Sequence, residues 1–511
     1  MLSPAAISGP LPRIGIIVLG LLAAAVILLR ADRARALAML GGLILAPVLL
    51  LADIWSSPQL RIIHRHPLYA LIGAAVALLV LAAAARGLTR RRQWFAPLAL
   101  VALPFRVPIS VSGTTYNLLV PLYFVIAAGA LAWLVPVLLE PEEAGIRRPP
   151  HRFEQLLALI LVLYGLGATY SAHFGALIGF EAALRNMSFF YVPFALLYVL
   201  LRDLSWCSAL LRRCLILLAG LAVLFSLVGF WEEATGQILL NPKLVAANQI
   251  HPYFTVNSVF FDPDIFGRFL ALVMILGVAV LIWETRARAV LTSAAVLAIL
   301  WGCLVLTLSR SSLAALLVGM AVLCALRWRA TRWVFGVGLL LAVIGAAAVA
   351  VSPRTFGFNQ GLNGASSGRA NLISGGLTMF SQRPLQGYGS GSFEAEYARQ
   401  HNGCGVVCAS HTIAVTVAGE QGLIGLIPYV AFVIAVLITL FRGARGSPAR
   451  AAIAAMFLAL VVHTEFYADF LEDPMTWVLL AVGGTLALAA ADAREAARRA
   501  ERSARRTTAA A

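Results

Sequence analysis

Arg310 is the residue whose position most needs a chemical explanation. It lies in Leu308–Ser312 (LSRSS), between two apolar segments that are each long enough to cross a bilayer. A charge at that depth needs an anion, a carboxylate partner or access to water. We interpret Arg310 as an anion-binding residue that faces a cavity at the membrane surface. The alternative is an arginine whose side chain extends to the lipid headgroups.

A second arginine, Arg369, begins a helical stretch predicted over 369–381. The free N–H groups of a helix N-terminus attract anions, and a guanidinium can add two parallel hydrogen bonds to a phosphate. Arg369 is therefore a second candidate for binding phosphate. The alternative is an ordinary solvated loop arginine.

Two histidines lie at the ends of apolar segments. His411 stands where a long polar segment returns to the membrane, and His463 ends a later apolar segment close to Glu465. Histidine titrates near neutrality and is the most frequent general base. His411 is the candidate base, or else a hydrogen-bonding anchor at the membrane interface. His463 is a candidate for the acceptor side of the same site, or a structural cap.

Cys404 and Cys408 are close in the sequence, in a segment expected on the oxidising side of the membrane. A disulfide between them fits that compartment; metal binding together with His401 or His411 is the alternative. The other four cysteines lie in or beside apolar segments, where a thiol serves as a small packing group. The six cysteines match no metal-binding spacing.

An acidic group follows His463 and precedes the last apolar segment. We expect it to be a solvated connection, with acceptor binding as the alternative. Its members are Glu465, Asp469, Glu472 and Asp473.

The elements that position these residues must be membrane helices. Of the 511 residues, 61% are hydrophobic and 12% are charged, with a mean hydropathy of +0.89. Soluble domains contain about 25% charged residues, so this composition excludes them. A net charge of +16 would suit a nucleic-acid partner, but the arginines cluster between apolar segments. That distribution excludes nucleic acid and follows the positive-inside rule.

The predicted fold class is all-α, a polytopic transmembrane helical bundle of about 12–15 spans, because a span needs about 20 apolar residues. The expected spans are 14–29, 36–52, 67–85, 94–105, 118–139, 154–170, 187–201, 212–231, 265–283, 289–308, 312–326, 333–351, 421–441, 450–465 and 475–491.

Arginines fall in every second connection, which predicts the N-terminus outside and the C-terminus in the cytoplasm. The clusters are at 30–35, 86–92, 147–152, 202–213, 286–288, 327–332 and 442–450. The expected organisation is N-terminal spans over 1–150, core spans over 151–351, one large extracytoplasmic loop over 352–410, C-terminal spans over 411–491 and a basic cytoplasmic tail over 492–511.

Several segments resemble, in order, the superfamily of O-antigen ligases and polymerases. These bacterial glycosyltransferases take glycans from a polyprenyl-diphosphate lipid. The resemblance covers roughly residues 150–490. The segments are Phe261–Asp264 (FDPD), Leu308–Leu313 (LSRSSL), Gly368–Arg369, Arg383–Phe393 (RPLQGYGSGSF), and His411 followed by Gly419–Leu426 (GEQGLIGL).

The resemblance implies a GT-C-like fold and an inverting, metal-independent transfer without a cofactor. Arg310 and Arg369 would hold the diphosphate of an undecaprenyl-diphosphate-linked glycan donor, with Arg185 as a third contact. His411 would act on the acceptor hydroxyl. The family usually has asparagine where this chain has Asp264 and Thr412, so the acceptor side, to which we assign Asp264 and His463, departs from the pattern.

The leading hypothesis is therefore a glycosyltransferase in the bacterial inner membrane, with its site on the periplasmic side. The expected acceptor is lipid A–core, as in a ligase; a polymerase would use another lipid-linked glycan. A flippase or transporter is the competing class, but transporters place charges near the bilayer midplane. A structural scaffold would need neither Arg310 nor Arg369.

Overall fold

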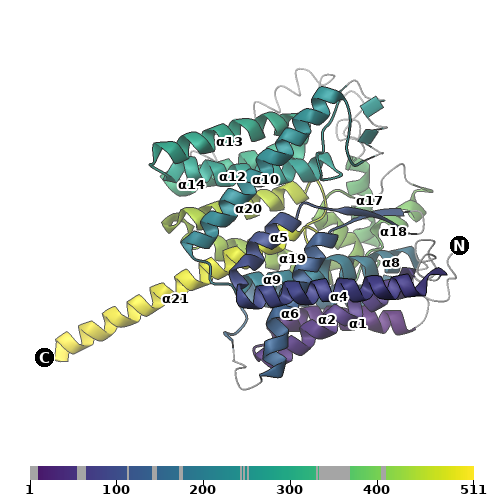
Figure 1. Ribbon diagram of the computed structural model, residues 1–511, viewed down its shortest axis with the longest axis horizontal. Helices are drawn as coiled ribbons and strands as arrows, with labels where there is room; N and C mark the ends of the chain where they lie inside the picture. Colours follow the sequence, from purple (N-terminus) through teal and green to yellow (C-terminus); the bar gives the residue numbers. More distant parts are fainter. Residues whose placement is uncertain are drawn as a thin grey trace.

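The computed structural model describes residues 10–54, 65–111, 114–140, 147–171, 177–241, 244–245, 248–249, 253–329, 332, 336, 369–403 and 410–510. These residues form an all-α bundle, as predicted, with one short β-hairpin (Figure 1). Twelve of the described helices are long and apolar enough to cross a membrane, and the chain is a multi-pass membrane protein. The predicted span over 333–351 and the loop residues up to 368 lie almost wholly outside the described residues.

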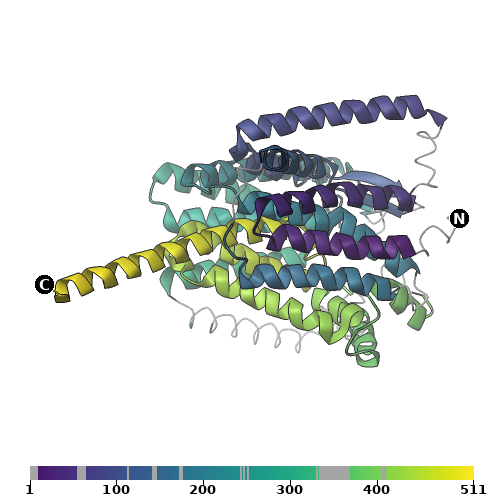
Figure 2. The same cartoon turned by 90° about the horizontal axis from the view of Figure 1, so that it is seen from below.

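The first half of the bundle contains α1 (Pro10–Leu28), α2 (Asp32–Ile54), α4 (Pro67–Arg90), α5 (Phe95–Ala102), α6 (Val120–Leu139), α7 (Arg152–Ser171), α8 (Leu177–Asn186), α9 (Val192–Arg202) and α10 (Ser208–Thr235). A π-helical turn, η5 (Met187–Tyr191), joins α8 to α9. α4 packs against α6 at the edge of the bundle and stands apart from the other helices (Figure 2).

The second half contains α12 (Pro263–Trp283), α13 (Ala287–Leu306), α14 (Arg310–Trp328), α17 (Arg369–Gln382), α18 (Phe393–Gln400), α19 (Ile413–Phe441), α20 (Pro448–Thr464) and α21 (Pro474–Ala510). α12, α14 and α20 pack against one another. α17 confirms the helix predicted over 369–381. α17 and α18 lie at one end of the bundle, which we call the site end, and α21 extends beyond the other (Figure 1).

The span predicted over 94–105 is not a continuous membrane helix. α5 has eight residues, about 12 Å at 1.5 Å per residue, whereas the hydrocarbon core is about 30 Å thick. It ends two residues before Pro104, as helices commonly do, because a proline disfavours helical backbone at the preceding residue. The chain continues through Arg106 into the antiparallel hairpin β1 (Val107–Val111) and β2 (Thr114–Leu118), in which Val107 pairs with Leu118.

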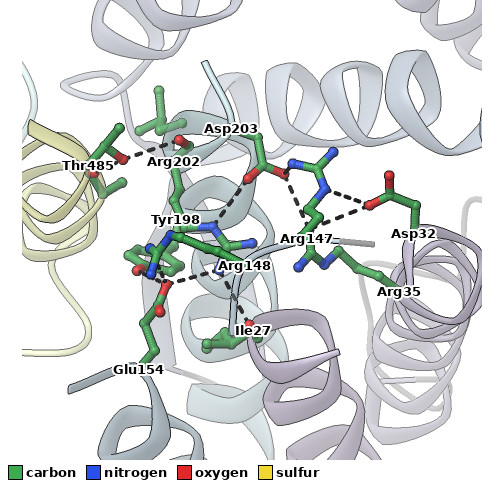
Figure 3. A network of polar contacts seen from close by, with 12 residues as sticks. Ile27, Asp32, Arg35, Arg147, Arg148, Glu154, Tyr198, Arg202, Asp203 and Thr485 are labelled. Atoms are coloured by element: carbon green, nitrogen blue, oxygen red, sulfur yellow. Dashed lines mark hydrogen bonds and ion pairs between the residues drawn. The ribbon is translucent and has the colours of Figure 1, made fainter. Parts of the chain in front are cut away.

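The connections that carry the arginine clusters meet at the end opposite to α17 and α18, which we call the basic end. A network of buried charges joins four parts of the chain there (Figure 3). The Glu154 carboxylate, which is fully buried, accepts hydrogen bonds from Tyr198 (2.8 Å), Arg202 (3.0 Å) and Arg148 (3.3 Å).

Asp203 extends this network to the N-terminal helices. Its carboxylate pairs with Arg147 at 2.5 Å and with Arg35 at 3.4 Å, and Arg147 also pairs with Asp32 of α2. On the other side, Thr485 of α21 donates a hydrogen bond to the Arg202 carbonyl. The network therefore fastens α2 and the start of α7 to α9 and α21.

Removing one buried charge from this network should destabilise the protein. We expect Glu154→Gln to lower the free energy of unfolding by about 3 kcal/mol, because it removes the buried carboxylate that pairs with Arg202 and leaves this buried arginine with Asp203 alone. Glu495→Gln, which breaks the exposed Arg499–Glu495 pair on α21, should cost about 0.5 kcal/mol or less. Unfolding of both variants in detergent, compared with the wild type, measures the difference. Equal stability of the two variants would contradict the structural role of Glu154.

Candidate active site

The N-terminus of α12 is fixed by Asp262. One oxygen of this carboxylate accepts hydrogen bonds from the backbone N–H groups of Asp264 (2.7 Å) and Ile265 (3.3 Å), and the other from the Tyr467 hydroxyl (3.1 Å). Pro263 follows at the first helical position, where its missing N–H is not needed. The Phe261–Asp264 segment therefore forms the N-terminal cap of α12 and places Asp264 in the first turn of that helix.

The N-terminus of α14 meets α12 at Asp264. Ser309 caps α14, and the hydroxyls of Ser309 and Ser311 lie 2.5 and 3.1 Å from one Asp264 oxygen. His463 at the end of α20 brings its Nε2 within 3.2 Å of the Ser311 hydroxyl. Arg310 is the first residue of α14, between these two serines, and its side chain is exposed. Asp264, His463 and Arg310 are therefore brought together.

His411 and Arg369 approach this cluster from the other side. His411 is partly buried, and its ring centroid lies 6.3 Å from that of Tyr467. Burial lowers the pKa of the His411 imidazole below its ordinary value, the Arg369 guanidinium lowers it further, and the Asp264 carboxylate opposes both. The imidazole is therefore neutral near pH 7 and able to accept a proton.

Four residues with unusual backbone lie around the cluster. Positive φ angles occur at Phe261 (61°), Leu308 (52°), His411 (58°) and Asp469 (128°). Such angles are rare for residues other than glycine, and strained backbone gathers at functional sites. Phe261 and Leu308 directly precede the two capping residues, so the strain sets where α12 and α14 begin.

Residues 384–389, which follow α17, are docked onto α19 by main-chain hydrogen bonds. The N–H groups of Tyr388 and Gly389 donate to the carbonyls of Gly419 and Glu420, and those of Leu423 and Ile424 donate back to residues 384 and 385. The Glu420 carboxylate accepts from the N–H groups of Gly391 and Phe393, at 2.9 and 3.1 Å. The glycine-rich motifs at residues 383–393 and 419–426 are therefore joined to each other by hydrogen bonds.

Glycine is required on both sides of this contact. A Cβ on Gly387 (φ +64°) would lie 2.4 Å from the Glu420 carbonyl carbon, and one on Gly422 (φ +58°) would lie 2.5 Å from that of Leu385. Because the obstacles are backbone atoms, a side chain cannot simply rotate away. The docking holds α17, and with it Arg369, beside the start of α19 and His411.

The acidic group after His463 is not the solvated connection that we predicted. Asp473 is buried and forms an ion pair with Arg268 of α12, and Glu472 accepts a hydrogen bond from the Tyr191 hydroxyl at 2.6 Å. Burial also raises the pKa of Asp469 to about 7. These carboxylates are internal parts of the site end.

Sequence analysis missed Arg268, although a signal was present. It lies one helical turn after Asp264, inside an otherwise apolar span, and an ionisable residue inside a span is by itself a functional-site signal. Its ion pair with Asp473 links residues 205 positions apart, which spacing cannot predict.

Arg185 lies on α8, at the site end of the bundle. It is buried on α8, pairs with Glu181 of that helix at 3.5 Å, and belongs to a helix that packs against α7 and α18. Cys404 and Cys408, and with them the predicted disulfide, lie outside the described residues.

Together these features define a polytopic α-helical membrane protein with a polar, arginine-bearing site at one end of its bundle. Residues 295–430 match the family described as O-antigen ligase. This match supports membership of the O-antigen ligase family, which the order of the motifs predicted, and the family suggests a glycosyltransferase-like membrane enzyme. The segment contains Arg310, Arg369 and His411; Phe261–Asp264 lies before it. No curated protein matches the chain.

The docked segment provides a test of the glycine contact. Gly387→Ala and Gly236→Ala both place alanine at a positive φ near 65°, but only Gly387 has an obstacle within 4 Å. Each should pay about 1 kcal/mol for the left-handed backbone. We expect only Gly387→Ala to undock residues 384–389 and to speed tryptic cleavage after Arg399 by about tenfold or more. Equal cleavage rates in the two variants would contradict the contact.

The pKa of His411 can be tested through its two charged neighbours. We expect half-protonation of His411 below the ordinary histidine value of about 6.5, so that it stays neutral until the pH falls below that value. Arg369→Gln should raise this pKa and Asp264→Asn should lower it, because the neighbouring charges have opposite signs. The pH dependence of His411 acylation by diethyl pyrocarbonate, followed by mass spectrometry, measures it. Shifts of the same sign in both variants would refute the arrangement.

Proposed function

We propose that this protein transfers a glycan from an undecaprenyl-diphosphate-linked donor to an acceptor hydroxyl at the outer face of the inner membrane. The observation that carries the proposal is that Asp264 contacts the two serines flanking Arg310, and that Asp264 and Arg369 both influence the pKa of His411. Arg310, Arg369 and His411 are the residues at which the family resemblance implies diphosphate binding and action on the acceptor.

The transfer is a single displacement at the sugar's anomeric carbon. His411 accepts the proton of the acceptor hydroxyl as its oxygen bonds to that carbon. The bond from the carbon to the diphosphate oxygen breaks, and its electron pair leaves with the diphosphate. Arg310 and Arg369 stabilise the negative charge of this leaving group, which is greatest in the transition state. One displacement inverts the anomeric configuration, and the product is polyprenyl diphosphate.

The positive-inside rule supports the proposed orientation. The arginine-bearing connections meet at the basic end, which belongs in the cytoplasm. The site end then faces the periplasm, where no nucleotide sugar is needed because the donor arrives on its lipid. For the acceptor we propose lipid A–core, the acceptor of ligases in the family that this chain resembles.

The glycolipids of a deletion strain test the function and the acceptor together. We expect lipid A–core without polymer, while full-length lipid-linked chains persist. Accumulation of single lipid-linked repeats would identify a polymerase instead, and lipid-linked material trapped on the cytoplasmic side would identify a flippase.

Complementation of the deletion strain with variant proteins tests the roles proposed for individual residues. Arg310→Ala, Arg369→Ala and His411→Ala should each reduce transfer by about 10²-fold or more while expression stays normal. Arg286→Ala, which changes an exposed arginine of the basic end, should restore transfer fully. Transfer by purified protein should continue in EDTA, because the guanidiniums provide the positive charge. Full activity of Arg310→Ala, or a strict need for a divalent cation, would overturn the proposed mechanism.

A further inference from the structure

A cavity of about 380 Å³ lies at the basic end of the bundle, among the buried charges of the network in Figure 3. Its walls come from the last turn of α1, from α2, from the chain before α7, from α7 and α9, and from the middle of α21. A water molecule takes about 30 Å³ in the liquid. The cavity therefore has room for a small polyatomic ion together with its water.

Four guanidiniums and three carboxylates line this cavity. They belong to Arg35, Arg147, Arg148 and Arg202, and to Glu154, Asp203 and Asp492. Asp32 adds a fourth carboxylate behind the lining, where it pairs with Arg35 and Arg147. The charges nearly balance, so net charge by itself does not indicate a ligand.

The hydrogen-bond donors, by contrast, are not fully used. Arg35 is 2% exposed, and its Nε has no partner among the described residues. Arg148 donates to Glu154 through one terminal nitrogen, and its side chain is still 41% exposed where it lines the cavity. A buried donor without a partner costs about 1–3 kcal/mol. An acceptor inside the cavity would remove this cost for Arg35.

The carboxylates of the network are already engaged. One Glu154 oxygen accepts hydrogen bonds from three side chains, and the other accepts a backbone N–H. The Asp203 carboxylate pairs with three arginines. The acceptor that Arg35 lacks therefore comes from outside the chain. A phosphate suits guanidiniums, because two parallel N–H groups can bond two of its oxygens.

We propose that this cavity binds a phosphate group, held by the guanidiniums of Arg35 and Arg148. The cavity lies at the opposite end of the bundle from the candidate active site, so the inference does not depend on glycan transfer. Its walls include the C-terminal ends of the spans α1 and α9, which places it at the depth of lipid headgroups. The phosphate group thus has two sources, the headgroup of an anionic phospholipid and a soluble phosphate compound, which share the chemistry that the arginines recognise.

Thermal unfolding of the purified protein in detergent tests the site. The first probe is inorganic phosphate, compared with chloride at the same ionic strength. A ligand that binds the folded state stabilises it, so we expect phosphate to raise the Tm of the wild type. Arg148→Gln should raise the phosphate concentration for half of this effect by about tenfold.

Two further variants control for the loss of charge. Arg152→Gln removes an exposed arginine four positions away that lies outside the cavity lining, and should bind phosphate as the wild type does. Asp492→Asn removes an exposed carboxylate from the lining, and should tighten binding by about threefold. Equal weakening in Arg148→Gln and Arg152→Gln would overturn the proposal.

A second probe distinguishes the two sources of the phosphate. Phosphatidylglycerol replaces inorganic phosphate in the same measurement, with phosphatidylcholine as its control. Stabilisation by phosphatidylglycerol alone, weakened by Arg148→Gln, would assign the site to a lipid headgroup. Stabilisation by inorganic phosphate alone, weakened in the same way, would assign it to a soluble compound. If neither probe gives a stabilisation that depends on Arg148, the cavity holds only water and the proposal is wrong.

Chemical modification of the wild-type protein avoids any folding defect of the variants. Phenylglyoxal reacts with accessible arginines, and mass spectrometry follows each site separately. A probe at about ten times its Kd leaves roughly a tenth of the sites free, so it should slow the modification of Arg148 by about tenfold while Arg152 reacts as before. Equal protection of both arginines, or protection of neither by either probe, would contradict the site.

Discussion

The candidate site depends on main-chain hydrogen bonds between residues 384–389 and 419–424. They join the segment after α17 to a break in α19, and so hold Arg369 and His411 near each other although the two are 42 positions apart. Since both partners are backbone, most substitutions leave the bonds in place. Gly387 and Gly422, where a Cβ would meet backbone atoms, must keep their identity for the contact to form.

Buried carboxylates at the basic end are closely matched by arginines. Glu154, Asp203 and Asp32 each have an arginine partner within 3.5 Å. Buried guanidinium donors without partners among the described residues occur at both ends of the bundle, on Arg35 and Arg450 at the basic end and on Arg268 and Arg106 at the site end. Because an unpaired buried charge is costly, the matched carboxylates account for the permanent fastening of the basic end.

Much of this architecture could be predicted from the sequence, because the membrane requires long apolar helices. The helix beginning at Arg369 and the segment order from Leu308 to Gly419 were also predictable, since local spacing carries them. The Arg268–Asp473 pair was not, because it depends on how α12 packs against the start of α21. The acidic group was misjudged for the same reason: a polar composition predicts exposure unless its partners are known. Pro104 was the available sign that the fourth span is broken.

The length of α21 has a consequence for what lies beyond the basic end of the bundle. Its 37 residues extend about 55 Å at 1.5 Å per residue, well over the roughly 30 Å that the hydrocarbon needs. A straight, continuous helix has one axis, so its arginine-rich last turns cannot lie flat on the headgroups while its first turns span the bilayer. The end of α21 therefore projects beyond the basic end of the bundle (Figure 1), into the aqueous phase where it meets soluble molecules rather than the membrane surface.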